Sequence, residues 1–125
     1  MSFCTAINCM DGRTQLPVNE YLQKRFKANY VDTITEPGPN GILARQTSPQ
    51  AVESIFKRVK ISLEAHRSVG IAIVGHHDCA GNPVPKEAQL ADIRGAMGAV
   101  RERFPDVPVI GLWVDDHWTV REIDG

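Results

Sequence analysis

Two short segments carry the residues of this chain that are best suited to chemistry. One is Cys9-Met10-Asp11-Gly12-Arg13 and the other is His76-His77-Asp78-Cys79. Each segment follows an apolar run that is typical of a β-strand. The thiols of Cys9 and Cys79 and the imidazole of His76 form a soft set of three ligands that suits zinc. Three protein ligands leave one position of a tetrahedral ion open, which is the arrangement of a catalytic zinc site.

The spacing within each segment predicts how its side chains converge. Alternate residues of an extended chain share one side, so we expect Cys9, Asp11 and Arg13 to face the same space. A guanidinium at Arg13 is suited to grip the Asp11 carboxylate with two hydrogen bonds. His76 and Cys79 are three positions apart, and a single turn of chain brings them together around a metal ion.

Composition excludes several classes of function. The chain has 125 residues and a formal net charge of -1, with no long run of one sign, so we expect no nucleic-acid or membrane partner. Its first residues lack the basic start and apolar stretch of a signal peptide, and no apolar run could span a bilayer. Three cysteines are an odd number, which favours metal binding over disulfides. We therefore expect one domain over residues 1–125, located in the cytoplasm.

The apolar pattern predicts alternating strands and helices. An amphipathic helix is expected over residues 17–27, another from the Ser48 N-cap until Gly70, and a third through residues 90–104. Residues 37–41 are expected to form a loop. The expected strands cover residues 3–9, 30–35, 71–74, 107–114 and 118–123.

This alternation predicts an α/β fold with three layers, in which a mostly parallel central sheet of about five strands has an antiparallel edge strand. Ligands of such sheets bind beyond the carboxyl ends of the strands, where the strand order reverses. Both chemical segments lie at such ends. If the first and third strands are neighbours, Cys9 meets His76 and Cys79 across a long sequence gap.

The same residues carry a resemblance to the β-class carbonic anhydrases. The motifs Cys9-x-Asp11-x-Arg13 and His76-x-x-Cys79 stand where that family has its zinc motifs. The likeness extends to residues 62–65 and 69–76 before the second motif, and to Gly111-Leu112-Trp113-Val114-Asp115 in the late strand. It covers most of the chain, from about Phe3 to Ile123.

The resemblance implies reversible hydration of carbon dioxide to bicarbonate. It implies that Cys9, His76 and Cys79 hold Zn²⁺, that zinc-bound hydroxide is the nucleophile, and that Asp11 and Arg13 orient it. It further implies a homodimer or a higher homo-oligomer. Two alternatives stay open: a related zinc hydrolase acting on a small electrophile such as carbon disulfide or carbonyl sulfide, and a non-catalytic zinc module. In that module, Asp11 would close the site by binding the metal directly.

Other polar residues have simpler interpretations. Cys4 is expected in the core and His66 near a helix C-terminus, where a partial positive charge is favourable. Asp78 is expected to brace its turn. Arg45 is expected to favour solubility, with attraction of bicarbonate as the alternative.

Overall fold

The computed structural model describes the chain over residues 1–125. A short 3₁₀ helix, Gly12–Thr14, joins the first strand to the first helix. The strands are β1 (Phe3–Cys9), β2 (Tyr30–Glu36), β3 (Ile71–His76), β4 (Val109–Val114) and β5 (Val120–Ile123), and the helices are α1 (Gln15–Arg25), α2 (Pro39–Arg45), α3 (Pro49–Ala65) and α4 (Lys86–Arg103).

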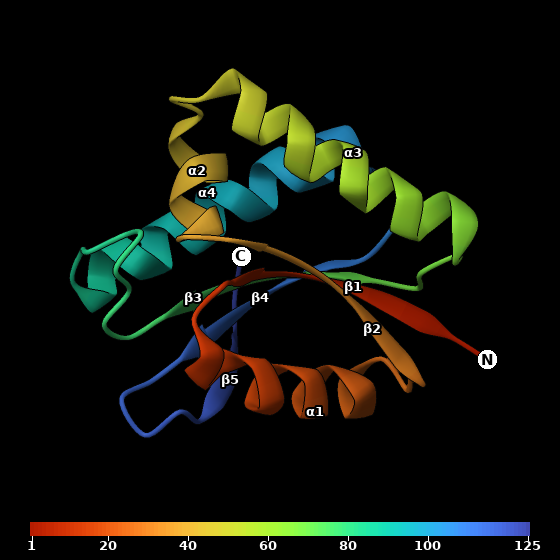
Figure 1. The fold of residues 1–125 in the computed structure, drawn as a ribbon, viewed down its shortest axis with the longest axis horizontal. Coiled ribbons are helices and arrows are strands. Elements are labelled where there is room, and N and C mark those ends of the chain that lie inside the picture. The colour runs from red at the N-terminus through yellow and green to blue at the C-terminus, as the bar shows by residue number, and fades with distance from the viewer.

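The five strands form one sheet in the order β2-β1-β3-β4-β5. All neighbouring pairs are parallel except β4 and β5, which are antiparallel. Helix α1 covers one face, and α2, α3 and α4 lie on the other (Figure 1). The predicted three-layer α/β fold is therefore confirmed, including its antiparallel edge strand.

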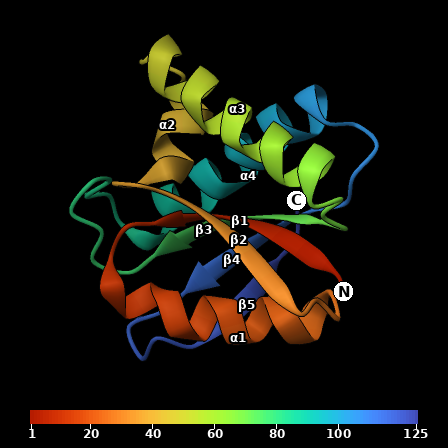
Figure 2. The same ribbon diagram turned by 45° about the vertical axis from the view of Figure 1, so that its right-hand side comes forward.

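The strand order reverses between β1 and β3. From β1 the chain moves outward to β2, and then returns to place β3 on the other side of β1. The register pairs Thr5 with Ile71 and Ile7 with Ile73, so both strands run toward the same edge of the sheet. Figure 2 shows this edge, where the loops that follow β1 and β3 lie side by side. This is the edge at which open α/β sheets bind ligands.

Two apolar clusters hold the layers together. On the face of α2, α3 and α4, 15 buried side chains include Ile7, Ile73 and Ile93. On the face of α1, 10 buried side chains include Val18 and Val74. Every residue of β3 is buried, as expected for a parallel strand that is covered on both faces.

One helix differs from the prediction. Residues 37–41 were expected to form a loop because Pro-Gly-Pro normally interrupts regular structure, but α2 begins at Pro39. Proline suits the first position of a helix, since its φ is already helical and it lacks only an amide hydrogen that would be unpaired there. Gly38 precedes it in the left-handed conformation with φ of 63°.

Several boundaries also differ: α1 lies two residues earlier than expected, α4 begins four residues earlier, β4 begins two residues later and β3 ends two residues later. Two further boundaries have a visible local cause. Helix α3 ends at Ala65 rather than at Gly70, because Arg67 turns left-handed (φ 52°) and the Ser68 amide returns to the Ser62 carbonyl. Gly70 instead lies against the Phe26 ring, where a Cβ atom would come within 2.2 Å. Strand β5 begins at Val120, since Trp118 has a φ of 59° and belongs to the preceding turn.

No helix combines the length and apolar character that crossing a bilayer requires.

Candidate metal centre

Three metal-ligating side chains meet at the edge where the strand order reverses. Cys9 is the last residue of β1, His76 is the last residue of β3, and Cys79 lies in the loop that follows. Their donor atoms all lie within 4.8 Å of one another, and all three residues are buried. The two sulfur atoms are 3.8 Å apart. The structure thus brings together the three residues that the sequence singled out.

The hydrogen bonding of His76 fits a metal ligand. Its Nδ1 atom lies 2.7 Å from the His77 carbonyl oxygen, to which a protonated Nδ1 donates. That bond leaves the lone pair on Nε2, and Nε2 is buried without any hydrogen-bond partner. A buried polar atom without a partner is costly. A zinc ion bound at Nε2 would satisfy this atom, and the Nδ1 bond to a carbonyl is one that histidine ligands of metals commonly make.

The surroundings shift the pKa values of the two thiols in opposite directions. A hydrogen bond from Cys79 holds the pKa of Cys9 well below its usual value, and His76 and the backbone amides of Gly38 and Asp11 act in the same direction. The same contact with Cys9, together with burial, raises the pKa of Cys79. One thiolate is therefore available before a cation arrives, and a divalent cation favours ionisation of the second.

Asp11 and Arg13 form an ion pair beside the three metal-ligating side chains. The Arg13 side chain donates from Nη2 to Asp11 Oδ2 at 2.7 Å and from Nε to Asp11 Oδ1 at 3.0 Å. These bonds, the largest cause, lower the pKa of Asp11 to about 2, although partial burial opposes the shift. The pair does not form along an extended segment as predicted. Instead, Asp11 caps the 3₁₀ turn, and its Oδ1 accepts the Arg13 amide at 2.9 Å.

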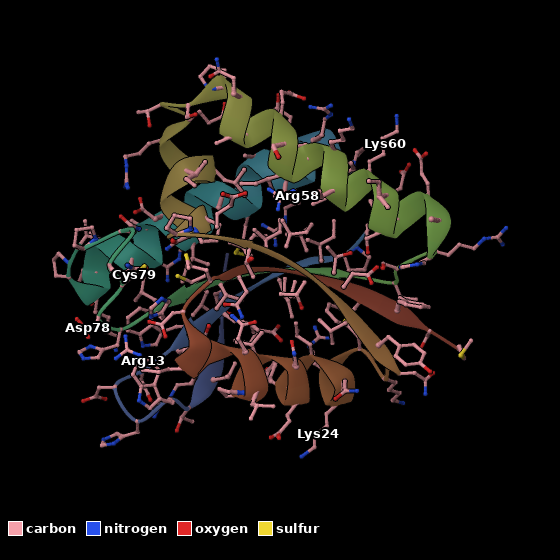
Figure 3. The ribbon with its side chains drawn as sticks, in the orientation of Figure 1. Arg13, Lys24, Arg58, Lys60, Asp78 and Cys79 are labelled. Atoms are coloured by element: carbon pink, nitrogen blue, oxygen red, sulfur yellow. The ribbon has the colours of Figure 1, made fainter.

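Two further residues hold Arg13, and sequence reasoning missed one of them. The Trp118 ring lies under the guanidinium, 4.3 Å from ring centroid to Cζ, which is a favourable cation–π geometry. On another side, Arg13 donates to the Asp78 backbone oxygen at 3.2 Å and to its carboxylate at 3.4 Å. Figure 3 shows Arg13 and Asp78 at the same edge of the sheet as Cys79. Asp78 was expected to brace its own turn, but the partner of its carboxylate is Arg13.

A small pocket opens next to Cys9 and Asp11. Its volume is about 210 Å³, and its wall is mainly apolar. A larger hollow of about 490 Å³ lies between α3 and the end of α4, but its charged walls contain none of the three donors. We therefore associate the chemistry with the smaller pocket, whose lining residues are Cys9, Met10, Asp11, Pro37, Ala80 and Gly81.

Comparison with known proteins agrees with this geometry. A family model described as "Putative carbonic anhydrase" matches residues 1–124. The chain belongs to this carbonic anhydrase family. No curated protein matches the chain.

Two solved structures share the fold of this carbonic anhydrase family member. One is from a study of two tetrameric β-carbonic anhydrases of the filamentous ascomycete Sordaria macrospora, with a TM-score of 0.55 and 13% identity over 98% of this chain and 80% of that one. The other is the β-carbonic anhydrase CafA of the fungal pathogen Aspergillus fumigatus, with a TM-score of 0.52 and 17% identity over 97% and 74% of the two chains. At these identities the likeness concerns the fold.

The remaining cysteine of this family member does not reach the site. Cys4 is fully buried in the cluster beneath α1, as expected. Burial, and secondarily the charge of Asp32, raises the pKa of the Cys4 thiol to about 11. The thiol is therefore neutral and belongs to the core.

His66 is the C-cap residue of α3, as expected of a residue near a helix C-terminus, and it also has side-chain partners. Its Nδ1 lies 2.6 Å from Asp32 Oδ2, and its ring stacks on Phe3. It completes a hydrogen-bonded cluster at the amino ends of the strands, which we call the amino-end network. Its members are Thr5, Asp32, Ser62, His66 and Ser68.

Arg45 has the exposed side chain expected of a surface residue, but it also has two buried partners. Its side chain is 49% exposed. Its two terminal nitrogens donate to Asp92 at 2.6 Å and to Asn82 at 2.8 Å. Arg45 therefore links α2 to α4 and to the loop after Cys79, in addition to its surface position.

Proposed function

We propose that this protein catalyses the zinc-dependent, reversible hydration of carbon dioxide to bicarbonate. The observation that carries the proposal is the meeting of three buried zinc donors with a clamped carboxylate. The donor atoms lie within 4.8 Å of one another, and Asp11 is fixed beside them by Arg13. Membership of a carbonic anhydrase family supports the same reaction.

Cys9, His76 and Cys79 would hold the metal, with His76 binding through Nε2. Zinc bound there supplies the Lewis acidity that turns water into a nucleophile near neutral pH. Two thiolates cancel its double charge, which weakens that acidity. The residues around the site must therefore favour the nucleophilic form of the attacking water.

Asp11 provides this assistance. Both of its carboxylate oxygens accept hydrogen bonds from Arg13, so the group stays ionised and keeps one orientation. A carboxylate oxygen has more than one acceptor site, so Asp11 can still accept a hydrogen bond from the attacking water. The clamp also favours a carboxylate that leaves the fourth metal position free. This supports the catalytic proposal over the non-catalytic module, in which Asp11 would itself be a ligand.

The pocket supports a small, uncharged substrate. With an apolar wall and a volume of about 210 Å³, it suits a linear molecule such as carbon dioxide. Carbonyl sulfide and carbon disulfide are larger but are also small, linear and uncharged, so hydrolysis of one of them is the second candidate.

One experiment separates the candidates. Metal analysis of the purified protein is combined with stopped-flow measurement of carbon dioxide hydration across pH. We expect one zinc per chain and hydration that rises with pH. Zinc without hydration, but with turnover of carbonyl sulfide or carbon disulfide, would identify the hydrolase. Zinc without any turnover would identify the non-catalytic module.

We further propose that residues 1–125 act as one zinc domain, that copies associate as a homodimer or larger assembly, and that the protein works in the cytoplasm. The three free cysteines support a reducing compartment, because thiolate ligands must escape oxidation. The tetramers named for the Sordaria proteins support assembly. Sedimentation of only a monomer at micromolar concentration would contradict the assembly.

A further inference from the structure

A mostly buried set of polar side chains lies behind the Cys79 loop, and the proposed chemistry does not use it. Three of its five members are only 1% exposed, Asp92 is 9% exposed, and the side chain of the fifth, Arg45, is 49% exposed. They come from α2, from the loop after Cys79 and from α4. We call this set the carboxyl-end network. Its members are Asn40, Arg45, Asn82, Gln89 and Asp92.

Asn82 is the centre of this network. Its Nδ2 donates to Asp92 Oδ2 at 2.9 Å, and its Oδ1 accepts from Arg45 at 2.8 Å. Its backbone carbonyl accepts from Gln89 Nε2 at 2.7 Å, while Gln89 Oε1 accepts from Asn40 at 2.7 Å. Asn82 is thus held through both its side chain and its backbone. Buried networks that are fully satisfied in this way fix a single arrangement of the chain.

The segment fixed by Asn82 interlocks with the turn that precedes α2. A Cβ atom on Gly38 would lie 2.7 Å from Asn82 Cβ and 2.8 Å from the Gly81 carbonyl carbon. A Cβ atom on Gly81 would lie 2.4 Å from the Pro37 carbonyl carbon. The two backbones therefore touch directly, and a displacement of one must displace the other.

Both sides of this interlock lie beside the metal-ligating residues. Pro37 and Gly81 line the same small pocket as Cys9. Gly81 and Asn82 follow Cys79 by two and three positions. Contacts behind the ligands of a metal orient those ligands and tune the metal.

We propose that Asn82 and Gln89 are positioning residues for the metal centre. Through the interlocked turns, the carboxyl-end network sets the place of Cys79 relative to Cys9. This inference rests on the part of the proposed function in which Cys9, His76 and Cys79 hold zinc. It does not depend on the identity of the substrate.

The test measures zinc affinity by competition with a chelator, together with the thiolate-to-metal charge-transfer spectrum of the Co²⁺-loaded protein. The variants are Asn82→Ala, which removes the central side chain, and Gln89→Glu, which keeps the shape but removes the donor to the Asn82 carbonyl. Ser62→Ala is the matched control, because Ser62 is equally buried but lies in the amino-end network. Melting of the metal-free proteins reports general destabilisation.

We expect Asn82→Ala and Gln89→Glu to weaken zinc binding about 10- to 100-fold and to alter the Co²⁺ spectrum. Ser62→Ala should lower the melting temperature and leave both metal readouts unchanged. If Asn82→Ala does not fold, Gln89→Glu decides alone, since it preserves the packing volume.

The inference is overturned if both variants bind zinc as the parent does, or if Ser62→Ala weakens binding as much as they do. A parent protein that binds no zinc would overturn the metal site itself. A parent that binds zinc but does not hydrate carbon dioxide would overturn only the proposed reaction.

Discussion

Polar side chains are buried at both ends of the sheet, but their polar atoms find partners in different ways. At the amino ends of the strands, Ser62 is bonded to Thr5, Ser68 and Asp32, and each bond is 2.7 Å long. At the carboxyl ends, His76 Nε2 is buried with no partner. A buried polar group needs a partner in the folded state. At the amino ends the partners come from the chain itself. At the carboxyl ends, the ligand atoms of Cys9, His76 and Cys79 are placed so that they can bind a cation.

This contrast predicts that polar substitutions at the amino end change stability, and that those at the carboxyl end change metal binding or rate. Each experiment below pairs one residue from the site with a chemically similar residue elsewhere in the molecule.

The largest effect is expected from the cysteines. Cys79→Ala removes one of three donors and should abolish stoichiometric zinc binding, whereas Cys4→Ala should keep zinc and lower only the melting temperature. The physical reason is that Cys4 is a neutral core thiol, fully buried below α1. Metal content after dialysis against a weak chelator checks both variants. Loss of zinc in Cys4→Ala would contradict the distinction between Cys79 as a metal ligand and Cys4 as a core thiol.

The next effect concerns two aspartates. Asp11→Asn removes the charge that assists the attacking water, and should lower kcat/KM for hydration about 10²- to 10⁴-fold. Asp32→Asn, in the amino-end network, should lower stability and leave kcat/KM unchanged. Stopped-flow hydration assays at equal zinc occupancy make the measurement. Similar rate losses in the two variants would show that general destabilisation, rather than the position of Asp11, causes the effect.

A smaller effect is expected from the aromatic partners of arginines. Trp118→Leu removes a cation–π contact with Arg13 that contributes about 0.5–2 kcal/mol, equivalent to about 2- to 30-fold in rate. Phe56→Leu removes a similar contact with Arg103 on the far side of the sheet, at 5.1 Å. The first variant should slow hydration, and the second should affect only thermal stability. An unchanged rate in Trp118→Leu would show that Trp118 does not position Arg13 for hydration.

The smallest effect is a pH dependence of stability. The folded pKa of Asp11 is about 2, below the ordinary value for an aspartate, so its ion pair stabilises the fold above about pH 4. This contribution is lost as the pH falls toward 2. Denaturant unfolding of the metal-free parent and Asp11→Asn should show a stability difference at pH 5 that shrinks by pH 2.5. A constant difference would contradict the assigned cause.

Much of the fold could be predicted from patterns within short segments. The continuous apolar run of β3 and the Ser48-Pro49 start of α3 both appear as expected. The largest errors are the helix found in place of the expected loop at residues 37–41 and the end of α3; the bounds of α1, α4, β3, β4 and β5 differ by up to four residues. At the end of α3 and the start of β5 the backbone turns left-handed: Arg67 and Trp118 both have positive φ, a conformation that is uncommon outside glycine and that these residue types do not predict.

For the candidate site, the sequence by itself determined the donor types. Two thiols, one imidazole and an Asp-x-Arg pair follow from residues that are at most four positions apart within each segment. The strand alternation also predicted the edge at which they meet, because parallel strands deliver their carboxyl ends to one side of a sheet.

Only the tertiary structure decided what holds those donors. Arg45 and Asp92 are 47 positions apart, and Trp118 reaches Arg13 from the opposite end of the chain. The periodicity of a segment reports which of its faces is buried but not which residue of another element lies against that face. The carboxyl-end network, the interlocked glycines and the aromatic support of Arg13 therefore became visible only when the elements were packed together.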